Sequence, residues 1–124
     1  MPERIVSPLI NKQTLLDLPS IDDAGMLGYE AMGLIRLFVP DTSFSLHVTG
    51  SDGDDQLYGL LATSRQLRLG LFYLSGLMYA RNVMEIPVVR DDAYMPEDIR
   101  VIAYRHSVRY PSSNPPWAQK PQSC

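Results

Sequence analysis

The chain has 124 residues, of which 45% are hydrophobic and 20% charged, and its formal net charge is −3. These values are typical of one globular domain, and so small a net charge excludes a protein that binds nucleic acid through bulk positive charge alone. No stretch approaches the roughly 18 apolar residues of a transmembrane helix, and the N-terminal residues lack the apolar core of a secretory signal. The one cysteine, Cys124, cannot form a disulfide within the chain, so we expect a cytoplasmic location.

The first predicted elements, in chain order, are a helix, a loop and a strand. Residues 11–18 predict a short helix with Asn11 as its N-cap. Residues 20–30 are acidic, contain glycine and have no clear period, so they are predicted to form a loop. Residues 31–39 begin a series of short apolar runs separated by turn residues, which is the pattern of a β-meander.

Apolar and polar residues alternate strictly over residues 44–50, FSLHVTG. This alternation predicts a half-buried strand with Phe44, Leu46 and Val48 in the core. His47 then falls on the polar face of that strand, where it is expected to be a solvated or hydrogen-bonded side chain.

The next stretch, GSDGDDQLYG over residues 50–59, holds three aspartates and three glycines. It does not match a calcium loop, because Gln56 and Leu57 occupy positions that need an acid and a glycine. The carboxylates of Asp52, Asp54 and Asp55 are expected to stay solvated on an exposed turn, which does not suit acid–base catalysis. Asp-Gly between two apolar runs predicts a hairpin loop, with Gly53 supplying the positive φ.

The second half of the chain continues the meander. Strands are predicted at 57–62 and 69–74, followed by a helix at 76–84 capped by Ser75. An edge strand or extended segment is predicted at 86–94, and one helical turn at 96–99. Residues 101–110 are interpreted as a last strand whose inner face carries Ile102, Tyr104, His106, Val108 and Tyr110. The fold prediction is therefore α+β: an antiparallel sheet of four to six strands with one or two short helices on one face.

Residues 111–124 predict an extended, proline-rich tail attached to a domain of residues 1–110. Such a segment does not fold alone. If it is ordered, Trp117 is the residue most able to fix it, in an apolar recess of its own sheet or of another chain.

The order of several blocks between residues 31 and 96 resembles the DUF2958 family of small uncharacterised proteins. The blocks are LFVPDTSFSLHVTG, LYGLLA, LGLFYLSGLMYARN and IPVVRDDAYMP. The resemblance implies an accessory protein of a plasmid, integrative element or phage. It implies no activity and no catalytic residue.

No catalytic, cofactor-binding or metal-binding residues are predicted. His47 and His106 have no partner at metal-ligand spacing, the glycines do not form a phosphate loop, and the residues around Ser75 do not form a nucleophile elbow. A terminal Cys124 is a poor candidate for a nucleophile.

The charge, in contrast, is divided unevenly. Residues 1–62 hold nine acids and three bases, whereas residues 63–124 hold five acids and eight bases. Uneven charge and a Pro-Trp tail are features that partner surfaces use. The candidate partner-binding residues are Asp22, Asp23, Arg100, Arg105, Arg109 and Trp117.

The sequence therefore favours a non-enzymatic protein-binding accessory protein of a mobile genetic element or phage. Its partner would be a host defence complex, such as a restriction or CRISPR effector that it inhibits, or its own copy. One alternative is a factor that binds nucleic acid with the arginine-rich half. The other is an enzyme whose site is assembled from scattered residues such as His47, Asp91 and Tyr94.

Overall fold

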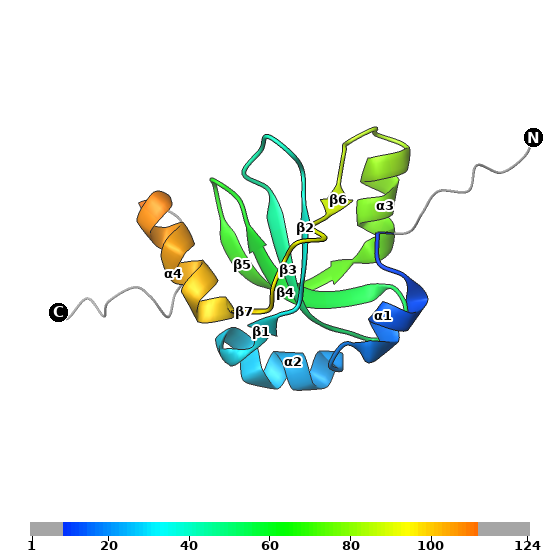
Figure 1. Cartoon of the computed structure of the whole chain (residues 1–124), viewed down its shortest axis with the longest axis horizontal. Helices are drawn as coiled ribbons and strands as arrows, with labels where there is room; N and C mark the ends of the chain where they lie inside the picture. The colour runs from blue at the N-terminus through cyan, green and yellow to red at the C-terminus, as the bar shows by residue number, and fades with distance from the viewer. Residues whose placement is uncertain (1–8, 112–124) are drawn as a thin grey trace, which may run out of the picture.

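The computed structural model describes residues 9–111, which form two antiparallel sheets and four α-helices around them. The larger sheet has the strand order β5-β4-β3-β2-β6, and the smaller one pairs β1 with β7 (Figure 1). The strands are β1 Met32–Gly33, β2 Ile35–Phe38, β3 Ser45–Ser51, β4 Gln56–Ala62, β5 Leu67–Tyr73, β6 Val89–Arg90 and β7 Glu97–Asp98. The predicted α+β class and the meander β2-β3-β4-β5 are confirmed, and β6 returns as the predicted edge strand beside β2.

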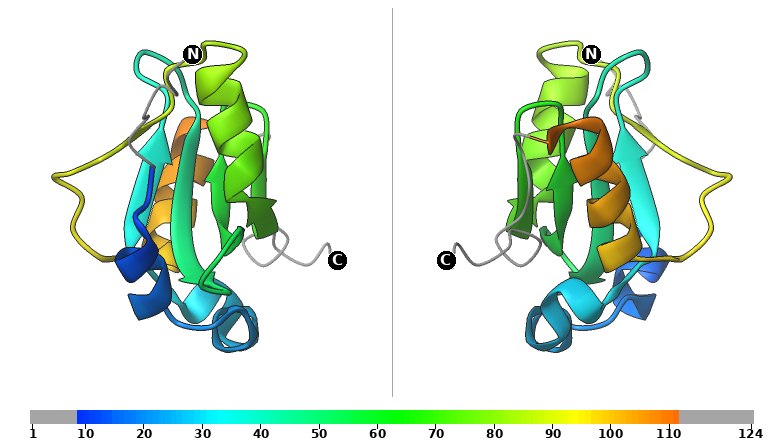
Figure 2. Two further views of the ribbon diagram at one scale, coloured as in Figure 1. Left: turned by 90° about the vertical axis from the view of Figure 1, so that its right-hand side faces the viewer. Right: turned by 90° about the vertical axis from the view of Figure 1, so that its left-hand side faces the viewer.

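The helices lie on both faces and at one end of the larger sheet, not on one face as predicted. They are α1 Lys12–Asp17, α2 Ile21–Leu27, α3 Leu74–Asn82 and α4 Ile99–Arg109, and a 3₁₀ turn, η1 Gly28–Glu30, follows α2. Figure 2 shows α3 and α4 on opposite sides of the sheet. In the described part of the chain, no helix is long and apolar enough to cross a membrane.

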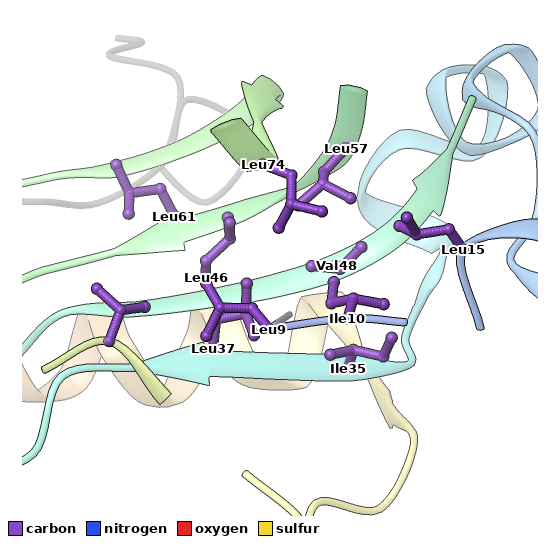
Figure 3. Packing of buried hydrophobic residues seen from close by; sticks show 11 residues of the cluster. Leu9, Ile10, Leu15, Ile35, Leu37, Leu46, Val48, Leu57, Leu61 and Leu74 are labelled. Carbon is purple, nitrogen blue, oxygen red and sulfur yellow. The ribbon is translucent and has the colours of Figure 1, made fainter. Parts of the chain in front are cut away.

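The main core lies on the face of the larger sheet that α1 and α3 cover. It combines alternate residues of the central strands, such as Leu37, Leu46, Val48 and Leu57, with Leu74 at the start of α3 (Figure 3). Because the first four of these side chains are fully buried, this face contributes most of the hydrophobic free energy of folding.

A smaller core lies on the opposite face, beneath α4. Ile99, Ile102 and Ala103 of the helix pack against Leu60 of β4. Their spacing is one face of an α-helix, not the alternation of a strand. All seven residues of β3 are buried, so the prediction of a half-buried strand was wrong. His47 lies against Tyr94, and the end of β3 at Gly50 and Ser51 lies against α2 and the residues just before it.

The loop predicted over residues 20–30 was also wrong, because α2 and η1 occupy it. The Ser20 side chain accepts a hydrogen bond from the Asp23 amide. Asp22 and Asp23 lie in the first helical turn, where their negative charges interact favourably with the helix dipole. Gly28 ends the helix with a φ of 55°. These capping residues outweigh the weak apolar period of the segment.

Residues 96–110 differ most from the sequence prediction. Instead of a helical turn, Glu97 and Asp98 form β7, and instead of a last strand, residues 99–109 form α4. Asp98 is the N-cap and accepts a hydrogen bond from the Arg100 amide. Tyr104 and Val108, which were placed on the inner face, are therefore exposed.

The acidic hairpin loop is confirmed, with Gly53 at a φ of 82°, but its carboxylates are not all solvated. Asp52 accepts hydrogen bonds from two amides of its own loop. Asp55 accepts hydrogen bonds from the amide and hydroxyl of Ser75 at 2.7 and 2.8 Å. Ser75 thus lies inside the first turn of α3, and the helix is capped by a carboxylate from the neighbouring loop instead of by Ser75 itself.

Candidate functional site

An open pocket with a volume of about 430 Å³ lies between α4 and the face of the sheet formed by β2 and β3. This volume is near the lower end of the range of small-ligand sites. Most of the pocket's lining residues are polar or charged: Arg36, Ser43, Ser45, His47, Ala62, Tyr94, Glu97, Ile102, Arg105, His106, Arg109 and Tyr110.

The imidazole of His47 lies at the centre of a line of three side chains. Its Nε2 is 3.1 Å from the Ser45 hydroxyl, and its Nδ1 is 3.1 Å from the Tyr94 hydroxyl. Ser45 and His47 are two residues apart on β3, so strand geometry places both side chains on the same face. Of the two predicted states of His47, solvated or hydrogen-bonded, the structure shows the second, and only 5% of the residue is exposed.

The surroundings hold both His47 and Tyr94 in their neutral forms. Burial, with a smaller contribution from the Arg36 guanidinium, lowers the pKa of His47 to about 4. Burial, together with the carboxylate of Glu97, raises the pKa of Tyr94 to about 12. At neutral pH this wall of the pocket therefore offers hydrogen bonds without charge.

Arg36 of β2 lines the pocket beside Ser45 and makes two polar contacts. Its Nε donates to the Ser45 hydroxyl at 2.8 Å, and its Nη1 forms an ion pair with Asp91 at 2.9 Å. Asp91 begins the segment that carries Tyr94: its carboxylate accepts from the Ala93 amide and its carbonyl oxygen from the Tyr94 amide. Asp91 thus positions Tyr94 through the backbone while it balances the charge of Arg36.

The α4 wall contains a second ion pair and one guanidinium without a carboxylate. Arg105 forms two hydrogen bonds with Glu97, at 2.6 and 3.0 Å, which hold the pKa of Glu97 below its usual value. Arg109 instead donates to the Tyr110 hydroxyl and lies over that ring. Among the described residues it has no acidic partner, so three guanidinium groups face two carboxylates around this pocket.

His106, predicted on the inner face of a strand, lies on the buried side of α4. Its Nε2 donates to the Thr63 carbonyl oxygen at 2.6 Å, and its Nδ1 has no hydrogen-bond partner within residues 9–111. This hydrogen bond ties α4 to the turn between β4 and β5, at the far side of the pocket.

The line Ser45–His47–Tyr94 has the order of a nucleophile, a base and an orienting group. Its protonation does not suit that role, because a base with a pKa of about 4 takes up a proton poorly at neutral pH. Tyr94 has no negative charge with which to stabilise an imidazolium. The arrangement is better suited to binding a group that accepts hydrogen bonds and carries negative charge.

The structure brings together only part of the predicted partner-binding set. Arg105 and Arg109 both line the pocket. Arg100 lies nine residues before Arg109, roughly 180° around the same helix, and therefore on the opposite flank. Asp22 and Asp23 lie on α2, away from the pocket lining, and Trp117 falls outside the described residues.

Sequence reasoning named His47, Asp91 and Tyr94 only as an example of a scattered enzyme site. His47 and Tyr94 do meet in the pocket, whereas Asp91 contacts Arg36 instead. Ser45 and Arg36 were missed. The spacing of Ser45 and His47 on a strand was the available signal, but nothing local indicated that a helix would cover that face.

The described residues contain no group of three or more histidine, cysteine or acidic side chains able to hold a metal ion. Comparison of the chain with protein-family models, curated proteins and solved structures found no match. The function is therefore argued from the site itself.

Proposed function

We propose that the protein is a non-enzymatic binding protein, and that an acidic group of a partner protein occupies the pocket between α4 and the sheet. The observation that carries the proposal is Arg109, a guanidinium at an open pocket with no carboxylate partner among the described residues. Arg36 and Arg105 beside it are already held in place by Asp91 and Glu97. A carboxylate entering the pocket would meet a fixed set of donors, and such charge-assisted hydrogen bonds are among the strongest.

A protein partner fits this surface better than nucleic acid does. Nucleic acid requires several cations along one track, because each phosphate contact adds to the affinity. On α4, Arg105 is tied to Glu97. Arg100 and Arg109, which have no acidic partner in the described part of the chain, lie on opposite flanks. The net charge of −3 also opposes non-specific attraction.

The resemblance of residues 31–96 to the DUF2958 family supports a mobile genetic element or phage as the setting. In that setting a host defence enzyme, of the restriction or CRISPR type, would be such a partner. This step rests on the resemblance and not on the pocket.

Affinity capture with three forms of the protein tests the proposal. The wild type, Arg109→Gln and Arg100→Gln are each used as bait, and the captured partner is then titrated by calorimetry. Losing a charge-assisted hydrogen bond should weaken binding by about 10- to 100-fold in Arg109→Gln. The matched Arg100→Gln, on the other flank of the same helix, should change it by less than about threefold.

Two outcomes would contradict the proposal. Equal weakening by both variants would place the contact outside the pocket. Capture that a nuclease abolishes, with a steep fall between low and moderate salt, would favour nucleic acid instead.

One observation favours a second candidate, an acyl-transfer enzyme with Ser45 as its nucleophile: the 3.1 Å contact between the Ser45 hydroxyl and His47 Nε2. A fluorophosphonate probe, which labels activated serines, distinguishes the two candidates. Binding without catalysis predicts no labelling of Ser45 between pH 6 and 9. Labelling that Ser45→Ala and His47→Gln both remove would establish the enzyme.

A further inference from the structure

The strand β5, Leu67–Tyr73, forms one edge of the larger sheet, since β4 is its sole neighbour in the strand order. The pairing with β4 runs without a register shift from Leu67 to Tyr73, so this pairing contains no β-bulge. Figure 2 shows that α3 and α4 lie over the two opposite faces of the sheet.

The ladder with β4 determines which backbone groups of β5 point outward. At one end the Thr63 amide donates to the Gln66 carbonyl, and at the other the Leu74 amide donates to the Asp55 carbonyl. Antiparallel pairs alternate between hydrogen-bonded and non-hydrogen-bonded, so the even-numbered residues 66–74 bond to β4. The amides and carbonyls of Leu67, Leu69, Leu71 and Tyr73 therefore point away from the sheet.

This edge lacks the features that usually prevent two sheets from joining. It has no proline and no bulge, and its single charged residue is Arg68. Leu71 and Tyr73 are 44% and 53% exposed. The strand is thus long, regular and largely apolar.

We propose that β5 pairs with β5 of a second copy of the chain, antiparallel and around a two-fold axis at Gly70. Only registers that pair odd-numbered residues satisfy the outward groups, and the one centred on Gly70 pairs the most. It joins Leu67 to Tyr73 and Leu69 to Leu71 by hydrogen bonds, and places Arg68 opposite Phe72. Within one chain the Arg68 guanidinium already lies 4.7 Å from the Phe72 ring centroid, so each copy offers the same cation–π pair to the other.

Gly70 itself supports this register. Nothing among residues 9–111 requires a glycine there: a Cβ at this position would meet only the end of the Arg68 side chain, at 3.7 Å, and the backbone has no positive φ. Glycine inside a strand often marks the close approach of another backbone. On the two-fold axis, Gly70 would face its own copy at a non-hydrogen-bonded pair, where backbones come closest.

A cysteine at the axis tests the register directly. In a Cys124→Ser background, Gly70→Cys should form an intermolecular disulfide on mild oxidation, because Cα atoms of such a pair are about 4.5 Å apart and within disulfide range. The matched Arg65→Cys lies five residues from the axis, so its two copies would be about 34 Å apart and should not cross-link. Equal cross-linking at both positions would indicate random collision and overturn the register.

The oligomeric state tests the pairing without a new cysteine. Light scattering should show a dimer for the wild type and a monomer for Leu71→Lys, because a charge at an edge opposes strand addition. Tyr79→Lys removes an exposed apolar side chain from α3, where 57% of the residue is exposed, and should leave the dimer intact. A wild type that stays monomeric at high concentration would refute pairing with a second copy. The edge would then be unpaired, or another segment or protein would cover it.

Discussion

At the scale of single residues, the character of the pocket depends on the surroundings that keep His47 and Tyr94 uncharged. His47 is neutral at neutral pH because burial, with the nearby charges of Arg36 and Arg105, lowers its pKa to about 4. The carboxylates of Glu97 and Asp91 act in the opposite direction. Tyr94 fits beside it because Gly33 has no side chain: a Cβ there would be 2.7 Å from the Tyr94 hydroxyl. Because His47 and Tyr94 are neutral, Arg109 is the pocket arginine whose charge no carboxylate of residues 9–111 balances.

Burial of neutral His47 predicts a loss of stability in acid. The folded-state pKa of about 4 is below the ordinary 6.5, so between these values the unfolded chain binds a proton that the folded chain does not. The contribution is complete above pH 6.5 and declines as the pH falls towards 4. The free energy of unfolding should be about 2 kcal/mol lower at pH 5 than at pH 7.

Urea unfolding at the two pH values measures this difference. His47→Gln should remove most of it, whatever that variant's stability at pH 7. His106→Gln, which keeps His47, should retain it. An undiminished difference in His47→Gln would show that other groups cause the acid sensitivity.

At the scale of elements, the carboxylate of Asp55 acts as the N-terminal cap of α3. It accepts from the Ser75 amide across the hairpin, so one side chain links the loop, the end of β5 and the helix. Asp55→Ala should lower the free energy of unfolding by about 1 kcal/mol. Asp54→Ala, whose exposed side chain makes no hydrogen bond among the described residues, is the control and should change it by less than about 0.5 kcal/mol. Equal effects of the two substitutions would show that the Asp55 carboxylate does not cap α3 and that the loop is only a solvated turn.

Helix α3 also carries a residue that opposes its own stability. Gly76 lies in its first half, and a Cβ there would meet no atom within 4 Å. Gly76→Ala should therefore raise the free energy of unfolding by about 1 kcal/mol. Thermal unfolding would detect this as a higher Tm, and a lower Tm would show that the position serves a purpose other than helix formation.

The sequence was sufficient for elements with a local signal, such as the cap at Asn11, the turn at Gly53 and the alternating strands. It was ambiguous for α4, because residues 101–110 alternate apolar and polar side chains at a period of two while Ile99, Ile102 and Ala103 recur at helical spacing. For the candidate site, too, local signals could be found in the sequence and contacts between distant residues could not. The ion pair Arg36–Asp91 joins residues 55 positions apart, and no local pattern indicates such a contact.

At the scale of the whole molecule, the uneven charge of the sequence becomes a matter of position. Helix α2, which carries Asp22 and Asp23, lies at the end of the sheet, whereas α4, which carries Arg100, Arg105 and Arg109, lies over one face (Figure 1). Within the positive half, Arg105 is balanced locally by Glu97. For the proposed partner, the charge that matters is thus Arg109, which lies at the pocket without an acidic partner among residues 9–111, and not the charge of a half-chain.

The two proposals together predict avidity. A two-fold axis through Gly70 runs perpendicular to the sheet, so both copies of α4, and both pockets, would lie on the same face of the joined sheet. Against a surface carrying the captured partner at high density, a dimer can bind twice, and its dissociation should be at least about 10-fold slower than that of the monomeric Leu71→Lys. At low density the two should dissociate at the same rate, because each pocket is unchanged. Surface plasmon resonance at the two densities makes the comparison, and equal rates at high density from a proven dimer would mean that the pockets do not act together.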